Sequence, residues 1–592
     1  MKSEFFKSRF LLLIVFGSMI AISSCKKILD VQPESVLDRE QTYRNVFDAD
    51  AAVMGVYGKF MNLAKQYILL NELRADLMSA TNNADDYLRQ LNNHSVTADN
   101  PYADPTPFYE VILNCNDVMA NFDIMLRDKK LKVDEYNQRY SDIASIRTFV
   151  YLQLGIHFGT VPYVTDPLFQ VSDLRNESLF PKLPFQQLLA ELIKTMEALP
   201  FKDIYPTSST LVTTVDQYFT QKFFINKYIL LGELYLWNGA YDPSSYRKAA
   251  TAFRVVISTE DNNGNINTRY NTYKIFFPDV TISNNISVQY IRFRESDINA
   301  LIESNTEGWR SIFSRGQANY DANFNYEWIW VLPFSRNFAP KNPFIDLFSN
   351  RGGSYLVKPS QQAIDNWNSQ VQRNNFPFDA RGRFTYKIID GQPVIMKFLY
   401  YSLNGSTFLP VINANGRSGD WFLYRAASLI QHYAEAANRD GRYKLAYALI
   451  NAGIGPTFDN TTSSDKTNSM QTYDIPPYDF DARNGDNPQF RATYYKNRGI
   501  RDRAYLKYTP VTNPADSLIQ IENMIVNEEG LELAYEGQRW PDLLRVALRR
   551  NDPAFLADKI YEKLNKDGNG NAAAARAKLM NKENWYLPFR WQ

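Results

Sequence analysis

Histidine and cysteine, the residues most often used as metal ligands and nucleophiles, are scarce in this chain. It has three histidines, His94, His157 and His432, and two cysteines among 592 residues. Zinc and metalloprotease motifs place such residues a few positions apart, as in HExxH, and the sequence contains neither HExxH nor a local group of histidine with cysteine. We therefore predict no metal, no cofactor and no catalytic residue.

Three short strings imitate ligand-binding loops without meeting their requirements. The Asp/Asn strings at 261–265 and 567–571 lack the sixth-position glycine and twelfth-position glutamate of a calcium-binding EF-hand. The GxGxxA string at 568–573 follows a helix-like segment, whereas a dinucleotide-binding loop follows a strand. We interpret the first two strings as surface turns and the third as a chance match.

Carboxylates are plentiful, since the chain has 64 Asp and Glu residues. A glycoside hydrolase brings two carboxylates to within about 5–9.5 Å of each other by folding, and not by their spacing along the chain. The number of acidic residues therefore decides nothing. A glycoside hydrolase stays an alternative without an assigned catalytic pair.

Aromatic residues are the most informative candidates for a binding site, with 38 Tyr, 38 Phe and 9 Trp. A flat ring can cover the apolar face of a sugar while nearby polar groups bond its hydroxyls. Trp309 and Tyr320 lie in an Asn-rich segment, where we expect exposure. Trp328 and Trp330 share one face with Tyr326 if their segment is a strand. That face is either core, the commoner outcome, or a ligand platform, and we retain both tryptophans as ligand-binding candidates beside Trp309 and Tyr320.

The start of the chain predicts export. Basic residues within positions 2–9 precede an uncharged run at 10–22, which is followed by small residues and Cys25. The run is shorter than the roughly 20 apolar residues of a membrane-spanning helix, and the pattern is that of a cleaved signal peptide, 1–24. The tetrapeptide 22–25, ISSC, resembles a bacterial lipobox. We expect Cys25 to carry an anchoring lipid; an ordinary signal peptide with an incidental cysteine is the alternative.

The remaining chain has the composition of a globular protein without a strong charge. Cleavage after residue 24 removes three basic residues and one acidic residue, so the formal charge of +1 becomes −1. This balance favours no nucleic-acid partner. Only Cys115 then remains without lipid, which leaves no intramolecular disulfide, and burial of a core must supply the stability.

The elements that position the candidate residues are predicted to be helical hairpins. Segment 434–450 has small residues, Gly441 and apolar residues at the offsets of a tetratricopeptide unit, and 232–253 keeps these offsets around Gly239. A third, fainter copy includes Gly537. Antiparallel helices joined by a tight turn need a glycine at the end of the first helix, often in the left-handed conformation. We predict that conformation at Gly239 and Gly441, and a stack of hairpins that share one core.

The middle of the chain has a different pattern. Apolar residues recur at helical spacing in 143–154 and 188–199, but from about 260 to 420 Asn, Gly, Ser and aromatics dominate. Short alternating runs there, with Asp390 and Gly391 between two of them, indicate hairpins. A second stretch, about 456–496, is dense in polar turn residues and predicts a surface loop.

These patterns predict a mainly α fold. It would be a tetratricopeptide-like helical hairpin superhelix, about 40–260 and 420–592, with a loop-rich, partly β ligand-binding elaboration at about 260–420.

Three segments, together with the lipobox, resemble the SusD/RagB family along nearly the whole chain. They are a helix and its following turn, 143–167, the helix that opens the clearest repeat, 422–441, and ELAYEGQRWPDLLR, 532–545. There are departures. Glu528 and Glu529 stand where the family usually has Glu-Arg, which leaves a buried ion pair of the family without its arginine.

The resemblance implies a single SusD-like domain over 25–592 with its ligand site in the variable half. It implies an outer-membrane lipoprotein that faces the exterior, a TonB-dependent SusC-like transporter as partner, and no reaction. Family ligands are mostly oligosaccharides and sometimes peptides, and an early loop, which here contains Tyr87, often contributes contacts. We therefore expect a protein that binds a nutrient and delivers it to the transporter. An outer-membrane glycoside hydrolase and a tetratricopeptide-type protein-interaction scaffold are the alternatives.

Overall fold

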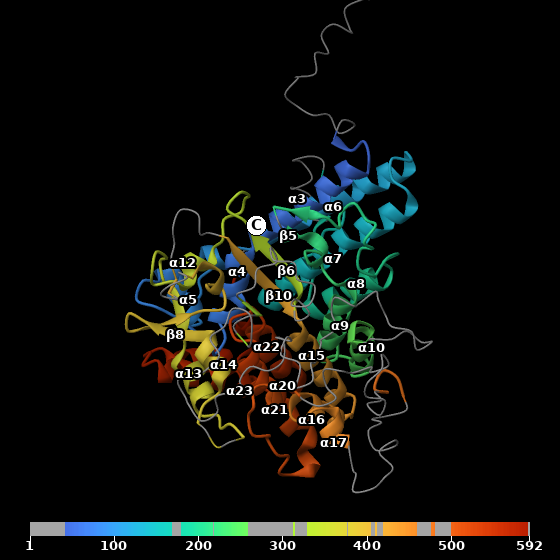
Figure 1. Ribbon diagram of the computed structural model, residues 1–592. Helices are drawn as coiled ribbons and strands as arrows, with labels where there is room; N and C mark the ends of the chain where they lie inside the picture. Colours follow the sequence, from blue (N-terminus) through green and yellow to red (C-terminus); the bar gives the residue numbers. More distant parts are fainter. Residues whose placement is uncertain are drawn as a thin grey trace, which may run out of the picture.

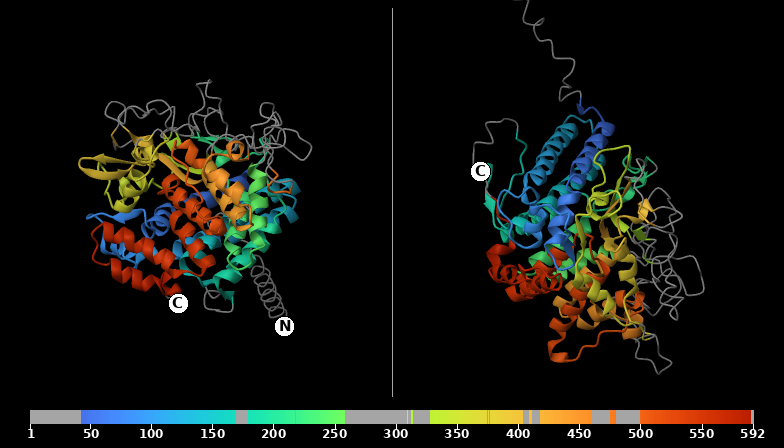
Figure 2. Two further views of the ribbon diagram at one scale, coloured as in Figure 1. Left: turned by 90° about the horizontal axis from the view of Figure 1, so that it is seen from below. Right: turned by 90° about the vertical axis from the view of Figure 1, so that its left-hand side faces the viewer.

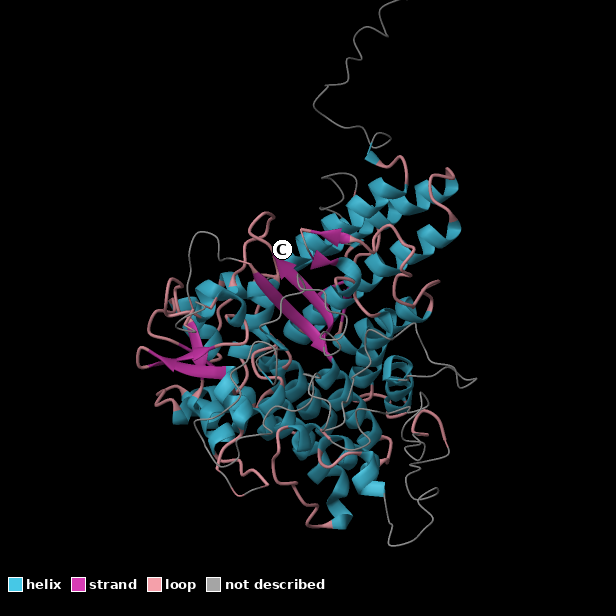
Figure 3. Cartoon of the chain, viewed as in Figure 1, coloured by secondary structure: helices cyan, strands magenta, loops and turns pink. Residues whose placement is uncertain are grey.

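Helices dominate the described chain, as the sequence predicts, and the strands are few and short (Figure 3). The computed structural model describes residues 42–168, 179–216, 218–257, 309, 312–313, 328–373, 375, 377–403, 409–410, 418–458, 475–479 and 499–589. Within those ranges, no helix combines the length and the apolarity that a membrane crossing requires. Cys25, and most of the stretches 260–327 and 456–496, lie outside the described residues, so the predicted domain limits stay predictions.

The first half of the described chain is a run of helices. They are α3 (Val46–Met61), α4 (Ala64–Ile68), α5 (Asp86–Asn92), α6 (Thr106–Arg127), α7 (Val133–Phe158), α8 (Phe185–Glu197), α9 (Lys227–Asn238) and α10 (Ser245–Ile257). Short strands separate some of them: β1 (Met78–Ala80), β2 (Val161–Pro162), β3 (Lys182–Leu183), β4 (Thr214–Val215) and β5 (Tyr218–Phe219). From α6 to α10, each helix packs against the next (Figure 1). Helix α7 contains the predicted stretch 143–154, and α8 contains 188–199 except for its last two residues.

The middle of the chain contains most of the longer strands. Its elements are β6 (Trp328–Phe334), α12 (Phe344–Phe348), β7 (Val357–Pro359), α13 (Gln361–Asn368), α14 (Ala380–Thr385), β8 (Tyr386–Ile389), β9 (Gln392–Ile395) and β10 (Gly419–Arg425). All the described sheets are two-stranded, and β6 pairs with β10 in antiparallel fashion. Asp390 and Gly391 join β8 to β9 with φ angles of +52° and +78°, so the predicted hairpin is confirmed.

The C-terminal part returns to helices and extends the stack. They are α15 (Ala426–Arg439), α16 (Tyr443–Ile450), α17 (Ile454–Phe458), α20 (Ile500–Arg503), α21 (Ser517–Glu532), α22 (Arg539–Arg550), α23 (Pro553–Lys566) and α24 (Ala572–Leu579). Helix α15 packs against α10 from the first half and against α16 and α21 (Figure 2). One cluster of buried apolar side chains extends through the whole arrangement, from Ala49 to Leu587, which is the shared core that stacked hairpins require.

The three predicted repeats are helical hairpins: α9–α10, α15–α16 and α21–α22. Gly441 follows α15 with φ +77°, so the predicted left-handed turn is confirmed there. Gly537 likewise has φ +86° between α21 and α22. These two turns need glycine because a side chain is penalised in this conformation.

The prediction of a left-handed turn at Gly239 is wrong. This residue has φ −57° and ψ −20°, which is ordinary right-handed geometry. Packing requires a glycine at this position, since a β-carbon built there would lie 2.3 Å from the Tyr246 ring on α10. The longer connection in this hairpin, residues 240–244, makes the reversal without a left-handed residue at the helix end.

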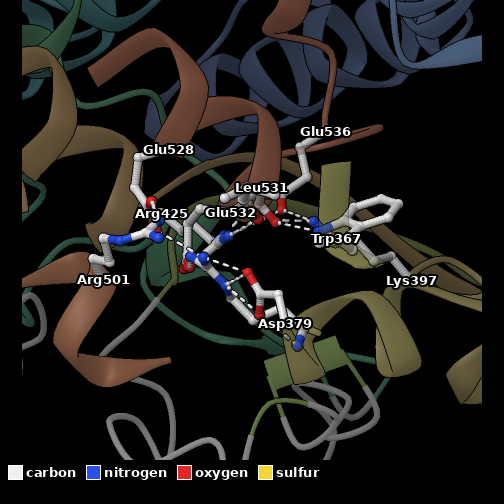
Figure 4. A network of polar contacts seen from close by, with 10 residues as sticks. Trp367, Asp379, Lys397, Arg425, Arg501, Glu528, Leu531, Glu532 and Glu536 are labelled. Atoms are coloured by element: carbon white, nitrogen blue, oxygen red, sulfur yellow. Dashed lines mark hydrogen bonds and ion pairs between the residues drawn. The ribbon is translucent and has the colours of Figure 1, made fainter. Parts of the chain in front are cut away.

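A buried network of ion pairs joins the middle of the chain to α21 (Figure 4). Arg381 of α14 lies 2.7 Å from Glu532, and Arg425, at the end of β10, lies 2.9 Å from the other oxygen of Glu532. Arg425 also bonds Glu536 at 2.8 Å, and Lys397 bonds Glu536 at 2.6 Å. All five side chains are at most 2% exposed. Because removing one buried partner leaves the other charge unpaired, the network holds these elements in a fixed arrangement.

Glu528, one of the two residues at which the sequence departs from the family's Glu-Arg, is paired with arginines from other elements. Glu528 lies 2.7 Å from Arg381 and 3.1 Å from Arg501 of α20. Its neighbour Glu529 is also buried, but its carboxylate has no hydrogen-bond partner among the described residues.

Candidate ligand-binding groove

Three of the tryptophans selected from the sequence belong to the core. Trp309 is 0% exposed, Trp328 2% and Trp330 4%. The expectation of an exposed Trp309 is therefore wrong. Its ring packs edge-on against Phe313, with 5.5 Å between centroids, and it lies 5.1 Å from the Arg425 guanidinium, so it covers the buried ion network instead of facing solvent.

Trp328 and Trp330 follow the alternative of a core face. The Trp330 ring stacks on Phe60 of α3 at 5.6 Å, and its Nε1 donates a hydrogen bond to the Phe223 carbonyl at 2.9 Å. The Trp328 ring lies 4.9 Å from that of Phe422 on the paired strand. The Trp330 ring thus packs β6 against α3, and the Trp328 ring packs β6 against β10. Tyr320 lies outside the described residues.

Tyr87 remains accessible. It lies on α5 and is 37% exposed. The Asp85 carboxylate caps this helix by accepting from the Leu88 N–H at 2.8 Å, and it also accepts from the Tyr102 hydroxyl at 3.0 Å. The Asn100 amide donates to the Tyr87 carbonyl at 2.9 Å. These bonds fix the backbone at the start of α5, and the role of Tyr87 as a ligand contact stays a prediction.

A groove of about 330 Å³ lies between α3, the β4–β5 hairpin and the end of β6. Its volume lies within the range of small-molecule sites. The groove is lined by Met54, Tyr57, Gly58, Met61, Val215, Asp216, Tyr218, Phe223, Leu332, Pro333, Ser335, Phe338, Ala339 and Pro340. Phe338 is 57% exposed, which makes its ring the most accessible aromatic surface of this lining.

Hydrogen-bonding groups are concentrated at one side of the groove. The Asp216 carboxylate accepts from the Ser335 hydroxyl and, at 3.0 Å, from the Asn337 amide. The Tyr218 hydroxyl lies 3.5 Å from that of Tyr401, which is 37% exposed. Ser335 and Tyr218 are buried, whereas Asn337 is exposed and Asp216 partly exposed, so the last two can bond ligand hydroxyls as donor and acceptor.

Asp420 lies on β10 next to this polar group. It is 4% exposed, and its carboxylate has no hydrogen-bond partner in the described part of the chain. Burial raises its pKa to about 7. Burial also raises the pKa of Tyr218, and the nearby charge of Asp420 adds to this effect.

The lining of the groove combines an exposed aromatic ring with hydrogen-bonding groups. An exposed ring beside a carboxylate and an amide suits a sugar, whose faces are apolar and whose edges carry hydroxyls. Asp216 is the only carboxylate among the described residues that line the groove. Phe338 was not selected from the sequence; its position in the polar, proline-containing segment SRNFAPKNP was the available signal for exposure.

Comparisons with known proteins agree with this helical architecture. The SusD family model matches residues 361–590. The fold is similar to that of a SusD superfamily protein from Bacteroides vulgatus (TM-score 0.56, 14% identity, 92% of this chain and 95% of that chain). The fold is also similar to that of a laminarin-binding SusD-like protein (TM-score 0.54, 15% identity, 92% of this chain and 96% of that chain). A third similar structure is surface glycan-binding protein A from Bacteroides uniformis (TM-score 0.54, 16% identity, 91% of this chain and 95% of that chain). No curated protein matches the sequence.

The fold thus defines the class, a helical protein built from tetratricopeptide-like hairpins. Within that class, residues 361–590 match the SusD family model, and the fold is similar to that of a SusD superfamily protein.

Proposed function

We propose that this protein is an outer-membrane surface lipoprotein that binds an oligosaccharide and passes it, uncleaved, to a TonB-dependent SusC-like transporter. The observation that carries the proposal is the groove in which the exposed Phe338 ring lies near the Asp216 carboxylate and the Asn337 amide. Tyr87 is proposed as a further contact, from the start of helix α5. Two proteins of similar fold are named for binding laminarin and surface glycans, which supports a carbohydrate ligand.

The affinity should be modest. An open groove with few hydrogen-bonding groups leaves much of an oligosaccharide hydrated, so dissociation constants between micromolar and millimolar are expected, or about −8 to −4 kcal/mol. Such affinities suit a protein that must release its ligand to a transporter.

Replacing Phe338 with alanine should weaken oligosaccharide binding about tenfold without destabilising the fold. Stacking a sugar face on the ring covers roughly 50 Å² of apolar surface, worth about 1.3 kcal/mol at 25 cal/mol per Å², and 1.4 kcal/mol corresponds to tenfold in Kd. Calorimetry with laminari-oligosaccharides, other glycans and peptides measures this change. Because the side chain is 57% exposed, its removal leaves no cavity in the core.

The matched control is Phe47→Ala, because Phe47 is 66% exposed on the same helix as Met54 but does not line the groove. The control should bind like the wild type. Equal affinities for the wild type, Phe338→Ala and Phe47→Ala would place the site elsewhere. A loss of binding in Tyr87→Ala alone would then assign the ligand to the α5 surface.

Replacing Cys25 with alanine should release the protein from the membrane. The proposed anchor consists of acyl chains on that cysteine, and each buried methylene contributes about 0.8 kcal/mol to membrane binding. Cell fractionation of a strain without the transporter measures the change, because the partner cannot then retain the protein. A Cys25→Ala variant that still sediments with outer membranes in this strain contradicts the anchor.

A further inference from the structure

Three helices of the C-terminal stack bring together a histidine and two carboxylates that are far apart in the sequence. They are His432 on α15, Glu529 on α21 and Asp542 on α22. One ligand atom from each lies within 4.8 Å of the other two, and all three residues are buried. This cluster is separate from the groove, whose lining includes none of the three.

The imidazole of His432 is oriented by contacts to Nδ1, the ring nitrogen that faces away from the cluster. Its Nδ1 lies 2.5 Å from the Glu233 carboxylate and 3.1 Å from the Tyr424 hydroxyl. Its Nε2 points to the cluster and lies 3.3 Å from Asp542 Oδ1. A carboxylate on one imidazole nitrogen that directs the other nitrogen toward a cation is a common arrangement at metal sites.

Glu529 is the member that the protein leaves unsatisfied. It is 2% exposed, and neither carboxylate oxygen has a hydrogen-bond partner among the described residues. A buried carboxylate without a partner is costly, so this position calls for either a proton or a cation.

The nearby arginines already have other partners. Arg545 bonds Glu435 at 2.6 and 2.8 Å and Asp542 at 2.8 Å. Arg549 pairs with Glu435 and, at 2.5 Å, with Glu522. Neither of these two arginines forms an ion pair with Glu529.

The dimensions suit a small metal ion. Two ligands about 2.1 Å from a tetrahedral ion lie roughly 3.4 Å apart, close to the 3.3 Å between His432 Nε2 and Asp542 Oδ1. A cavity of about 60 Å³ adjoins the site and is lined by Glu233, Tyr424, His432 and Asp542 among others. It has room for a water molecule, which could complete the coordination.

We propose that His432, Glu529 and Asp542 form a site for a divalent transition-metal ion, with Zn²⁺ as the best fit to one imidazole and two carboxylates. The ion would bind α15, α21 and α22 together at the centre of the helical stack. Its role is structural, and it is independent of ligand binding in the groove.

The test is calorimetric titration of the EDTA-stripped full-length protein with ZnCl₂. We expect one equivalent to bind with a Kd below 10 µM and to raise the thermal unfolding midpoint. Glu529→Gln should lose this site while its metal-free form stays folded by circular dichroism, because the amide keeps the shape and removes the unpaired charge. His432→Gln should lose it too.

The matched control is Glu583→Gln, an exposed glutamate outside the cluster, which should bind Zn²⁺ like the wild type. Cobalt(II) provides a second readout, since d–d absorption bands should form in the wild type and be absent in Glu529→Gln. The proposal is overturned if the wild type binds no Zn²⁺, or if folded Glu529→Gln or His432→Gln binds it with unchanged stoichiometry and affinity.

Discussion

Replacing Arg425 with alanine is expected to lower the free energy of unfolding by about 3–5 kcal/mol, the usual cost of removing one member of a buried ion pair. The guanidinium bonds Glu532 at 2.9 Å and Glu536 at 2.8 Å, and all three side chains are at most 2% exposed. Without the guanidinium, the buried carboxylates of Glu532 and Glu536 each lose one of their cationic partners. The Trp309 ring, 5.1 Å from this guanidinium, would also border a cavity. The urea midpoint of unfolding measures the loss.

Two comparisons isolate the cause. Arg351→Ala removes an ion pair to Asp390 whose side chains are 40% and 55% exposed, so its effect should stay within about 1 kcal/mol. Adding Glu532→Gln to Arg425→Ala should recover part of the loss, because one of the unpaired charges is removed as well. An Arg425→Ala protein as stable as Arg351→Ala would show that the network does not carry the stability assigned to it.

The second large effect is expected at Gly537, where two costs combine. A side chain at φ +86° is penalised by roughly 1–2 kcal/mol, and a β-carbon there would lie 2.2 Å from the Tyr67 ring, which adds about 1–3 kcal/mol of overpacking. The backbone N–H of Gly537 also donates to buried Glu72 at 2.7 Å. Gly537→Ala should therefore destabilise the protein by about 2–5 kcal/mol in urea unfolding.

Alanine substitutions at Gly441 and Gly239 measure the conformational cost and the packing cost separately. Gly441 has φ +77° but no atom within 4 Å of an added β-carbon, so Gly441→Ala should show the conformational penalty alone, about 1 kcal/mol or more. Gly239 has ordinary geometry and only the contact with Tyr246, so Gly239→Ala should show the packing cost alone. If Gly441→Ala is as damaging as Gly537→Ala, the contact with Tyr67 is not the reason for the larger effect.

Local patterns predicted the scaffold well because each depends on neighbouring residues. Small residues and a glycine at fixed offsets predicted the hairpin at Gly441, and Asp390 with Gly391 predicted the β8–β9 turn. Gly239 has the same spacing as Gly441 but a different reason for being glycine. That reason, the Tyr246 ring on the next helix, depends on packing and is absent from the local pattern.

The site was harder to predict because exposure and proximity are tertiary properties. Trp309 lies in a polar segment, yet its ring covers an ion network assembled from distant elements. Phe338 is exposed, although nothing in its residue type distinguishes it from the many buried phenylalanines. His432, Glu529 and Asp542 have no motif spacing, since three separate helices bring them together, and the predicted absence of a metal rested only on local motifs.

The most direct test of the central claim is to titrate the wild-type protein with an oligosaccharide and then recover the ligand. Laminari-oligosaccharides are the first to use, with mannan, xylan and starch fragments and peptides of similar size in parallel. The account predicts saturable binding of at least one glycan in the micromolar to millimolar range, with all of the ligand recovered at its original length by chromatography after overnight incubation. Shortened products would contradict it in favour of a hydrolase. Binding of proteins but of no glycan or peptide would contradict it in favour of an interaction scaffold.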